Sequence, residues 1–76
     1  MADNLIYVKL LDEGIEVWRP IAAVRTGENT FRITEVEQEG SGESWEFHNG
    51  QNVLVEQRVL GGEAVLVAVV ESPTFR

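Results

Sequence analysis

The sequence predicts an all-β fold, a small barrel of five to six antiparallel strands. Short runs of alternating apolar and polar residues are separated by turns rich in Gly and Asn, and no window keeps apolar residues at helical spacing between capping residues. The 76 residues have room for one hydrophobic core. We therefore expect a single domain over residues 1–76, with flexible ends at 1–4 and 72–76.

The first two predicted strands lie on either side of an acidic turn. Leu5–Leu11 is rich in aliphatic residues and stops at the turn Asp12–Gly14. The next run begins at Ile15 and alternates as far as Pro20. Because proline has no amide hydrogen to donate, Pro20 predicts an edge, a bulge or a barrel corner, beyond which the strand continues to Val24 on a bent path.

The middle of the chain predicts a third strand, a loop and a fourth, short strand. Thr30–Thr34 follows a turn at residues 26–29, and Val36 falls out of its alternation, which predicts a bulge near residues 34–35. Residues 37–43 are polar, acidic and Gly-rich, and therefore predict a loop. Trp45–Phe47 then predicts a short strand that ends at the turn His48–Gln51.

The last part of the chain predicts a β-hairpin. Val53–Leu60 and Glu63–Val70 are strand-like, and the pair Gly61-Gly62 joins them. The second of these strands is apolar on both faces, whereas a strand in a small barrel normally shows one face to water. We therefore expect a loop or another subunit to cover its outer face, and a homodimer through the hairpin from Val53 to Val70 is one such arrangement.

Composition and charge narrow the classes of partner. Thirteen acidic residues against six basic ones give a net charge of -7, which disfavours binding to nucleic acid. No basic run precedes an apolar segment, and no stretch approaches the length of a membrane helix. The chain has no cysteine, so it can form neither disulfides nor a thiolate metal site. We expect a cytoplasmic protein that does not enter the membrane.

The polar residues do not predict an active site. His48 is the single histidine, and no hydroxyl residue lies in a nucleophile-elbow pattern. The acidic residues around the 37–43 loop lack the calcium-binding pattern. We expect no enzyme, no catalytic residue, no metal and no cofactor. Glu35, Glu37 and His48 form the only polar cluster that a small hydrolase could use, and this is the least favoured class.

The aromatic residues indicate a binding module. In so small a core we expect Phe31 and Phe47 to be structural. Trp18, Arg19 and Trp45 are the predicted binding surface, and the acidic charge favours a basic or proline-rich segment of another protein. The alternative is an RNA-binding or translation-associated barrel whose basic face would be formed by four arginines: Arg19, Arg25, Arg32 and Arg58.

Three motifs resemble a group of short bacterial proteins of unknown function. They are the run Val17–Ala23 (VWRPIAA), Phe31-Arg32-Ile33, and the run Trp45–Gly50 (WEFHNG). The group shares VWRPVxA, YRI and WEFxxG before a valine-rich strand, and the likeness extends from Tyr7 to about Val70. It implies a small SH3-like barrel and carries over no catalytic residues.

The chain departs from this group at two places. Phe31 stands where tyrosine is common, and His48-Asn49 replace prolines before the glycine. The second change puts in doubt a shared binding surface around that turn. The run from Trp18 to Phe31 also resembles Tudor and other SH3-like modules, which bind peptides, methylated side chains or RNA. That likeness is one of fold, and fold does not determine function.

Overall fold

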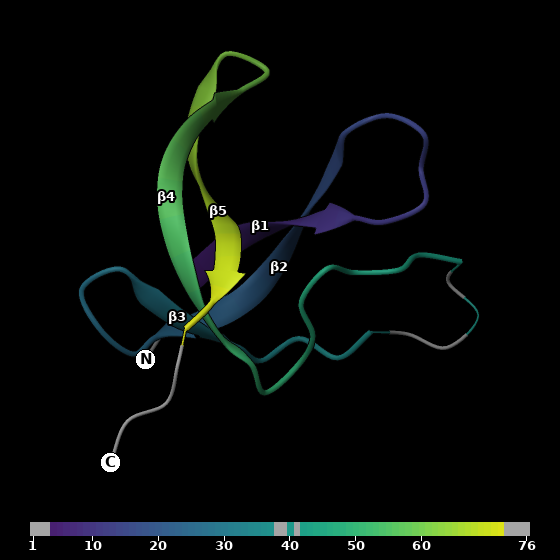
Figure 1. The fold of residues 1–76 in the computed structure, drawn as a ribbon. Helices are drawn as coiled ribbons and strands as arrows, with labels where there is room; N and C mark the ends of the chain where they lie inside the picture. Colours follow the sequence, from purple (N-terminus) through teal and green to yellow (C-terminus); the bar gives the residue numbers. More distant parts are fainter. Residues whose placement is uncertain (1–3, 38–39, 41, 73–76) are drawn as a thin grey trace.

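The computed structural model describes residues 4–37, 40 and 42–72, and it confirms the all-β prediction (Figure 1). No helix occurs in these ranges. The five strands are β1 (Asn4–Leu10), β2 (Val17–Arg25), β3 (Thr30–Ile33), β4 (Asn52–Leu60) and β5 (Glu63–Glu71).

The strands form one closed ring in chain order. Each strand from β1 to β4 pairs antiparallel with the strand that follows it. The ring closes where β5 meets β1, and there the pairing is parallel and has a single register pair, Tyr7 with Val67. We call this junction the seam. The prediction of antiparallel strands therefore holds for four of the five junctions and fails at the seam, because an odd number of alternating strands closes with its first and last strands parallel.

The core fills the inside of the ring. Alternate residues of β1 point inward, as the sequence pattern predicts, and the aromatic rings of Phe31 and Phe47 are buried at 2% and 8% exposure. Their prediction as core residues is confirmed. The remaining core side chains are aliphatic apart from one tryptophan: Ile6, Val8, Leu10, Ile21, Ala23, Ile33, Trp45, Val53, Val55 and Ala68.

The connection between β3 and β4 packs against the ring without forming the predicted strand at Trp45–Phe47. Only an isolated bridge joins Trp45 to Leu10, flanked by hydrogen bonds from Leu11 N to Ser44 O and from Glu46 N to Lys9 O. The segment continues the sheet for too few residues to be a strand. Part of the predicted 37–43 loop, at residues 38, 39 and 41, lies outside the described residues.

The backbone is irregular at residues 34–35, one of the two predicted positions, whereas Pro20 lies within a continuously paired strand. Thr34 N and Glu35 N both donate to Ala22 O, at 3.1 and 3.2 Å, which is the pattern of a bulge. Pro20 lies within β2 opposite Tyr7. The opposite edge of β2 pairs with β3 only from Ala23 onward. The lack of an amide hydrogen on Pro20 therefore removes no hydrogen bond from the β2–β3 ladder.

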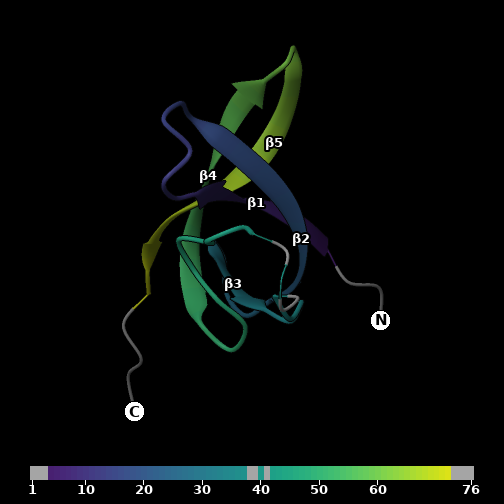
Figure 2. The same cartoon turned by 90° about the vertical axis from the view of Figure 1, so that its right-hand side faces the viewer.

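The β4–β5 hairpin is the longest paired element, and its turn projects beyond the rest of the ring (Figures 1 and 2). Gly61 and Gly62 have φ angles of 59° and 84°, as the two central residues of a type I′ turn require. The predicted hairpin is confirmed. A register shift between Leu54 and Val55 marks a further bulge.

Two residues of the predicted ends, Asn4 and Ser72, fall within the described ranges. Asn4 belongs to β1, and Ser72 N donates to Asn52 O at 2.8 Å. The prediction of flexible ends at 1–4 and 72–76 stays a prediction. Residues 1–3 and 73–76 lie outside the described residues.

Candidate binding groove beside the seam

Two of the predicted binding residues meet through a third residue, Glu43. The indole Nε1 of Trp45 donates to Glu43 Oε1 at 3.2 Å, and Arg19 Nε lies 3.4 Å from the same oxygen. The longer distance is that of an ion pair rather than of a close hydrogen bond. Trp45 is only 3% exposed, so its ring belongs to the core and offers no surface to a partner.

Trp18 lies on the other face of β2 from Arg19. The register places Arg19 opposite Val8, whose side chain is in the core, and Trp18 opposite Lys9. The guanidinium of Arg58 lies 5.9 Å from the centre of the Trp18 ring, within the range of a cation–π contact. The three residues predicted as one surface therefore lie apart: Trp45 is in the core, Arg19 is on the inward face of β2, and Trp18 is on its outward face.

One residue on the outward face of β5, Val67, is also buried. Val67 is fully buried but is not part of the main core cluster. It pairs with Tyr7, on the face of β1 that points away from the core. The chain itself thus covers one of the outward valines that sequence analysis left unexplained, whereas Val69 and Val70 stay 37% and 49% exposed.

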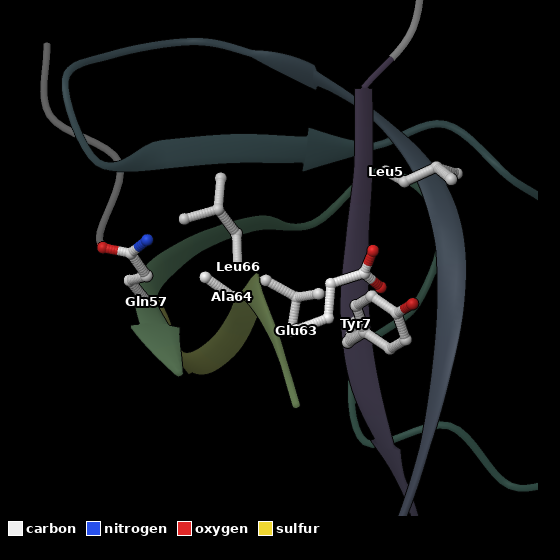
Figure 3. A pocket seen from close by; sticks show the side chains of 7 residues that line it. Leu5, Tyr7, Gln57, Glu63, Ala64 and Leu66 are labelled. Atoms are coloured by element: carbon white, nitrogen blue, oxygen red, sulfur yellow. The ribbon is translucent and has the colours of Figure 1, made fainter. Parts of the chain in front are cut away.

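Beside the seam lies a hollow of about 370 Å³ (Figure 3). Sequence analysis did not predict it. The one signal in the sequence was the strand with two apolar faces. The hollow is lined by two residues of β1, one of β4 and four consecutive residues of β5: Leu5, Tyr7, Gln57, Glu63, Ala64, Val65 and Leu66. We call this hollow the seam groove.

The seam groove exists because β5 departs from β1. Among the described residues the two strands pair only at Tyr7 and Val67, and the hairpin then projects away from the ring. Successive side chains of a strand point to opposite faces, so a hollow on one face of β5 would be lined by every second residue. Since Glu63–Leu66 all line it, the groove runs along the edge of β5.

Four of the seven lining residues are apolar, and the other three carry polar groups. Leu5, at 64% exposure, forms part of the rim. The Tyr7 hydroxyl, the Gln57 amide and the Glu63 carboxylate are the polar groups, and Glu63 and Tyr7 project toward the same part of the groove in Figure 3. Among the described residues that line the groove, Glu63 is the only charged one, so the lining carries a negative charge.

The predicted polar cluster comes together only in part. His48 Nδ1 lies 3.0 Å from Glu37 Oε1, whereas Glu35 Oε1 accepts a hydrogen bond from Ala22 N at 2.8 Å. None of the three lines the seam groove. Over residues 4–37, 40 and 42–72, no group of three or more His, Cys, Asp and Glu side chains is placed to hold a metal ion.

The four arginines do not form one face. Arg19 pairs with Glu43, and Arg58 pairs with Glu56 at 2.8 Å. Arg25 lies over the Phe31 ring at 5.6 Å, and Arg32 is on β3. Two of the four positive charges are therefore opposed by a carboxylate, and the four residues are spread over three strands.

The fold and the groove define a small β-barrel with an incompletely paired seam. Comparisons of the chain with family models, with curated proteins and with solved structures give no match. No helix in the described part of the chain has the length and apolar character that crossing a membrane requires. The resemblance to short bacterial SH3-like proteins stays a prediction.

Proposed function

We propose that this protein is a non-enzymatic binding module that takes a basic, extended segment of another protein into the seam groove. The observation that carries the proposal is the composition of the groove, which combines apolar walls with a single carboxylate, that of Glu63. Its volume of about 370 Å³ falls within the range of about 300–1,000 Å³ typical of ligand sites.

Charge supports a basic partner. The chain has a net charge of -7, so a lysine- or arginine-rich segment is attracted to the molecule from a distance and then to Glu63 in the groove. The same charge opposes an RNA partner and a second copy of the chain. The absence of cysteine supports the cytoplasm as the place where the protein acts.

The proposed site differs from the predicted surface but adjoins part of it. Val65 lines the groove and stands opposite Arg58 in the β4–β5 ladder, and Arg58 covers Trp18. Trp18 is therefore retained as a neighbour of the site. Arg19 and Trp45 are assigned instead to the contact with Glu43. The spread of the arginines gives the RNA-binding alternative no support.

A peptide titration tests the proposal. We expect a short peptide of alternating lysine and valine to shift the amide NMR signals of Leu5, Tyr7 and Ala64, and a matched peptide of glutamate and valine to leave them unchanged. Glu63→Gln should weaken binding about twofold to fivefold, because a partly exposed ion pair contributes up to about 1 kcal/mol. Glu28→Gln removes the same charge from the exposed β2–β3 turn and is the control.

Two results would contradict the proposal. The first is that the lysine peptide causes no shift in the groove residues at any concentration used. The second is that Glu63→Gln and Glu28→Gln weaken binding equally, which would mean that the peptide responds only to the overall charge.

A further inference from the structure

The open edge of β5 suggests how a segment binds in the groove. We infer that the partner segment adds to the barrel as a β-strand and pairs its backbone with the edge of β5 at Glu63–Leu66. This inference rests on the proposed function. The groove is then the place where a further strand joins the sheet, and both the backbone and the side chains of the segment take part in binding.

Residues Glu63–Leu66 of β5 have one free edge. Glu63–Leu66 pair with Leu60–Gln57 of β4 on one side. On the other side no strand pairs with them within the described part of the chain, because β1 meets β5 only at Val67. In an antiparallel ladder every second residue directs its N–H and C=O groups away from its partner strand. Alternate residues of this stretch therefore present unpaired backbone groups along the groove.

The seam groove follows this edge. Four consecutive β5 residues line it, and their side chains point alternately to the two faces of the strand. The groove therefore extends over both faces, as the space taken by an added strand would. An open strand edge is a template for pairing with another chain, and proteins use it to recognise extended peptides. The β1 wall, with Leu5 and Tyr7, leaves this edge accessible through the groove.

The strand registers divide the lining residues into two chemically different sets. Tyr7 pairs with Val67, so Tyr7 and Leu5 share a face with Val65 and Glu63. The other face carries Ala64, Leu66 and Gln57, the last of which stands opposite Leu66. Alternate side chains of an added strand would meet an acidic, aromatic face and a mainly apolar face. The preferred segment should therefore alternate basic and apolar residues.

Backbone methylation of the peptide tests the inference without changing the protein. One version of the lysine–valine peptide carries N-methyl groups on alternate amides, and a second version carries them on the remaining amides. Every side chain is kept in both. If the peptide pairs with β5, one version loses the amides that donate to the edge and should bind at least about tenfold more weakly, since each lost hydrogen bond to a carbonyl weakens binding severalfold. The other version should bind within about twofold of the parent.

The outcomes separate the inference from the proposed function. Equal binding of both methylated versions, with Glu63→Gln still weakening the parent peptide more than Glu28→Gln does, would overturn strand addition and leave the groove as a binding site. No binding of the parent peptide would overturn both. Sedimentation equilibrium supplies a further check: a dimer that the parent peptide does not dissociate, together with unshifted signals of Leu5, Tyr7 and Ala64, would mean that a second copy occupies the edge and would overturn the inference.

Discussion

Glu43 is the residue that fixes the position of Trp45. Its Oε1 accepts the indole N–H at 3.2 Å, and the nearby Arg19 guanidinium opposes its charge. The Trp45 ring can therefore be buried without leaving its one donor unpaired, which would carry a free-energy cost. Arg19 and Glu43 are 43% and 28% exposed, so their ion pair contributes little stability compared with burial of the ring.

Replacing Trp45 should destabilise the fold strongly. We expect Trp45→Ala to lower the free energy of unfolding by about 3–5 kcal/mol, because it removes a large buried ring and leaves a cavity. That is a large part of the roughly 5–15 kcal/mol that holds a folded domain together. Urea unfolding followed by circular dichroism measures the change.

Two further variants sharpen this test. Trp45→Phe keeps most of the apolar burial and should cost less than Trp45→Ala. Glu46→Ala changes the exposed neighbouring residue and should leave the unfolding midpoint almost unchanged. A Trp45→Ala protein as stable as the wild type would contradict the assignment of Trp45 to the core.

Single residues could be predicted where alternation determined the face. Phe31 and Phe47 are in the core as expected. The same alternation implied that Trp18 and Arg19, as neighbours on one strand, face opposite sides, and this should have excluded them from one flat surface. The burial of Trp45 depends on Glu43 and on a bridge to Leu10, and no local pattern in the sequence contains that contact.

The β4–β5 hairpin sets the shape of the seam groove because it holds Glu63–Leu66 away from β1. Its turn requires positive φ at both central positions, and glycine takes such angles at least cost. A side chain added at Gly61 or Gly62 would meet no atom within 4 Å, so any effect of substitution there comes from the backbone conformation alone.

The two turn glycines should respond differently to substitution. Gly61→Asn should be neutral or stabilising, because asparagine tolerates the left-handed region and Asn-Gly is a preferred type I′ pair. Gly62→Ala should lower the free energy of unfolding by about 1 kcal/mol, since alanine is strained at that φ. Thermal and urea unfolding of the two variants provide the comparison. Equal stability of both would argue against the type I′ turn.

The strands could be predicted more fully than the groove between them. The Gly-Gly pair and the flanking valines predict the hairpin from residues that are neighbours in sequence. The groove depends on where the first strand meets the last, and nothing local in either strand specifies that only Tyr7 and Val67 pair. The unusual β5 strand could therefore be predicted from the sequence, and the site beside it could not.

At the scale of the whole molecule, charge is the dominant property. The net charge of -7 is held within a radius of gyration of 12.2 Å. At ~0.01 M salt the screening length is about 30 Å, which is comparable to the extents of the molecule, 37 × 31 × 24 Å, and at ~0.15 M it is about 8 Å. The excess acidic groups therefore repel one another at low salt and are largely screened at physiological salt.

Salt should have opposite effects on folding and on binding. Raising NaCl from ~0.01 to ~0.15 M should raise the free energy of unfolding by up to about 1 kcal/mol, because it screens self-repulsion in the compact state. The affinity for the lysine–valine peptide should fall over the same range. Urea unfolding and NMR titration at both salt concentrations give the two trends. Peptide affinity that did not change with salt would contradict an electrostatic contribution to recognition.

The homodimer through the Val53 to Val70 hairpin stays a prediction. Val59 and Val70 are 70% and 49% exposed on that hairpin and could take part in self-association. The charge acts against it at low salt. Sedimentation at both salt concentrations distinguishes a monomer from an association that appears once the charge is screened.

The seam also has a consequence for the order in which the barrel assembles. Every other strand pair joins neighbours in the chain and needs only a short or moderate loop to close, whereas the seam joins the first strand to the last. Contacts between distant parts of a chain form slowly and at high entropic cost, and here only one register pair joins the two strands. We therefore expect the meander of antiparallel strands to form before the ring closes. The seam would then be the last junction to form and the first to open. The groove therefore lies beside the least stable junction of the barrel.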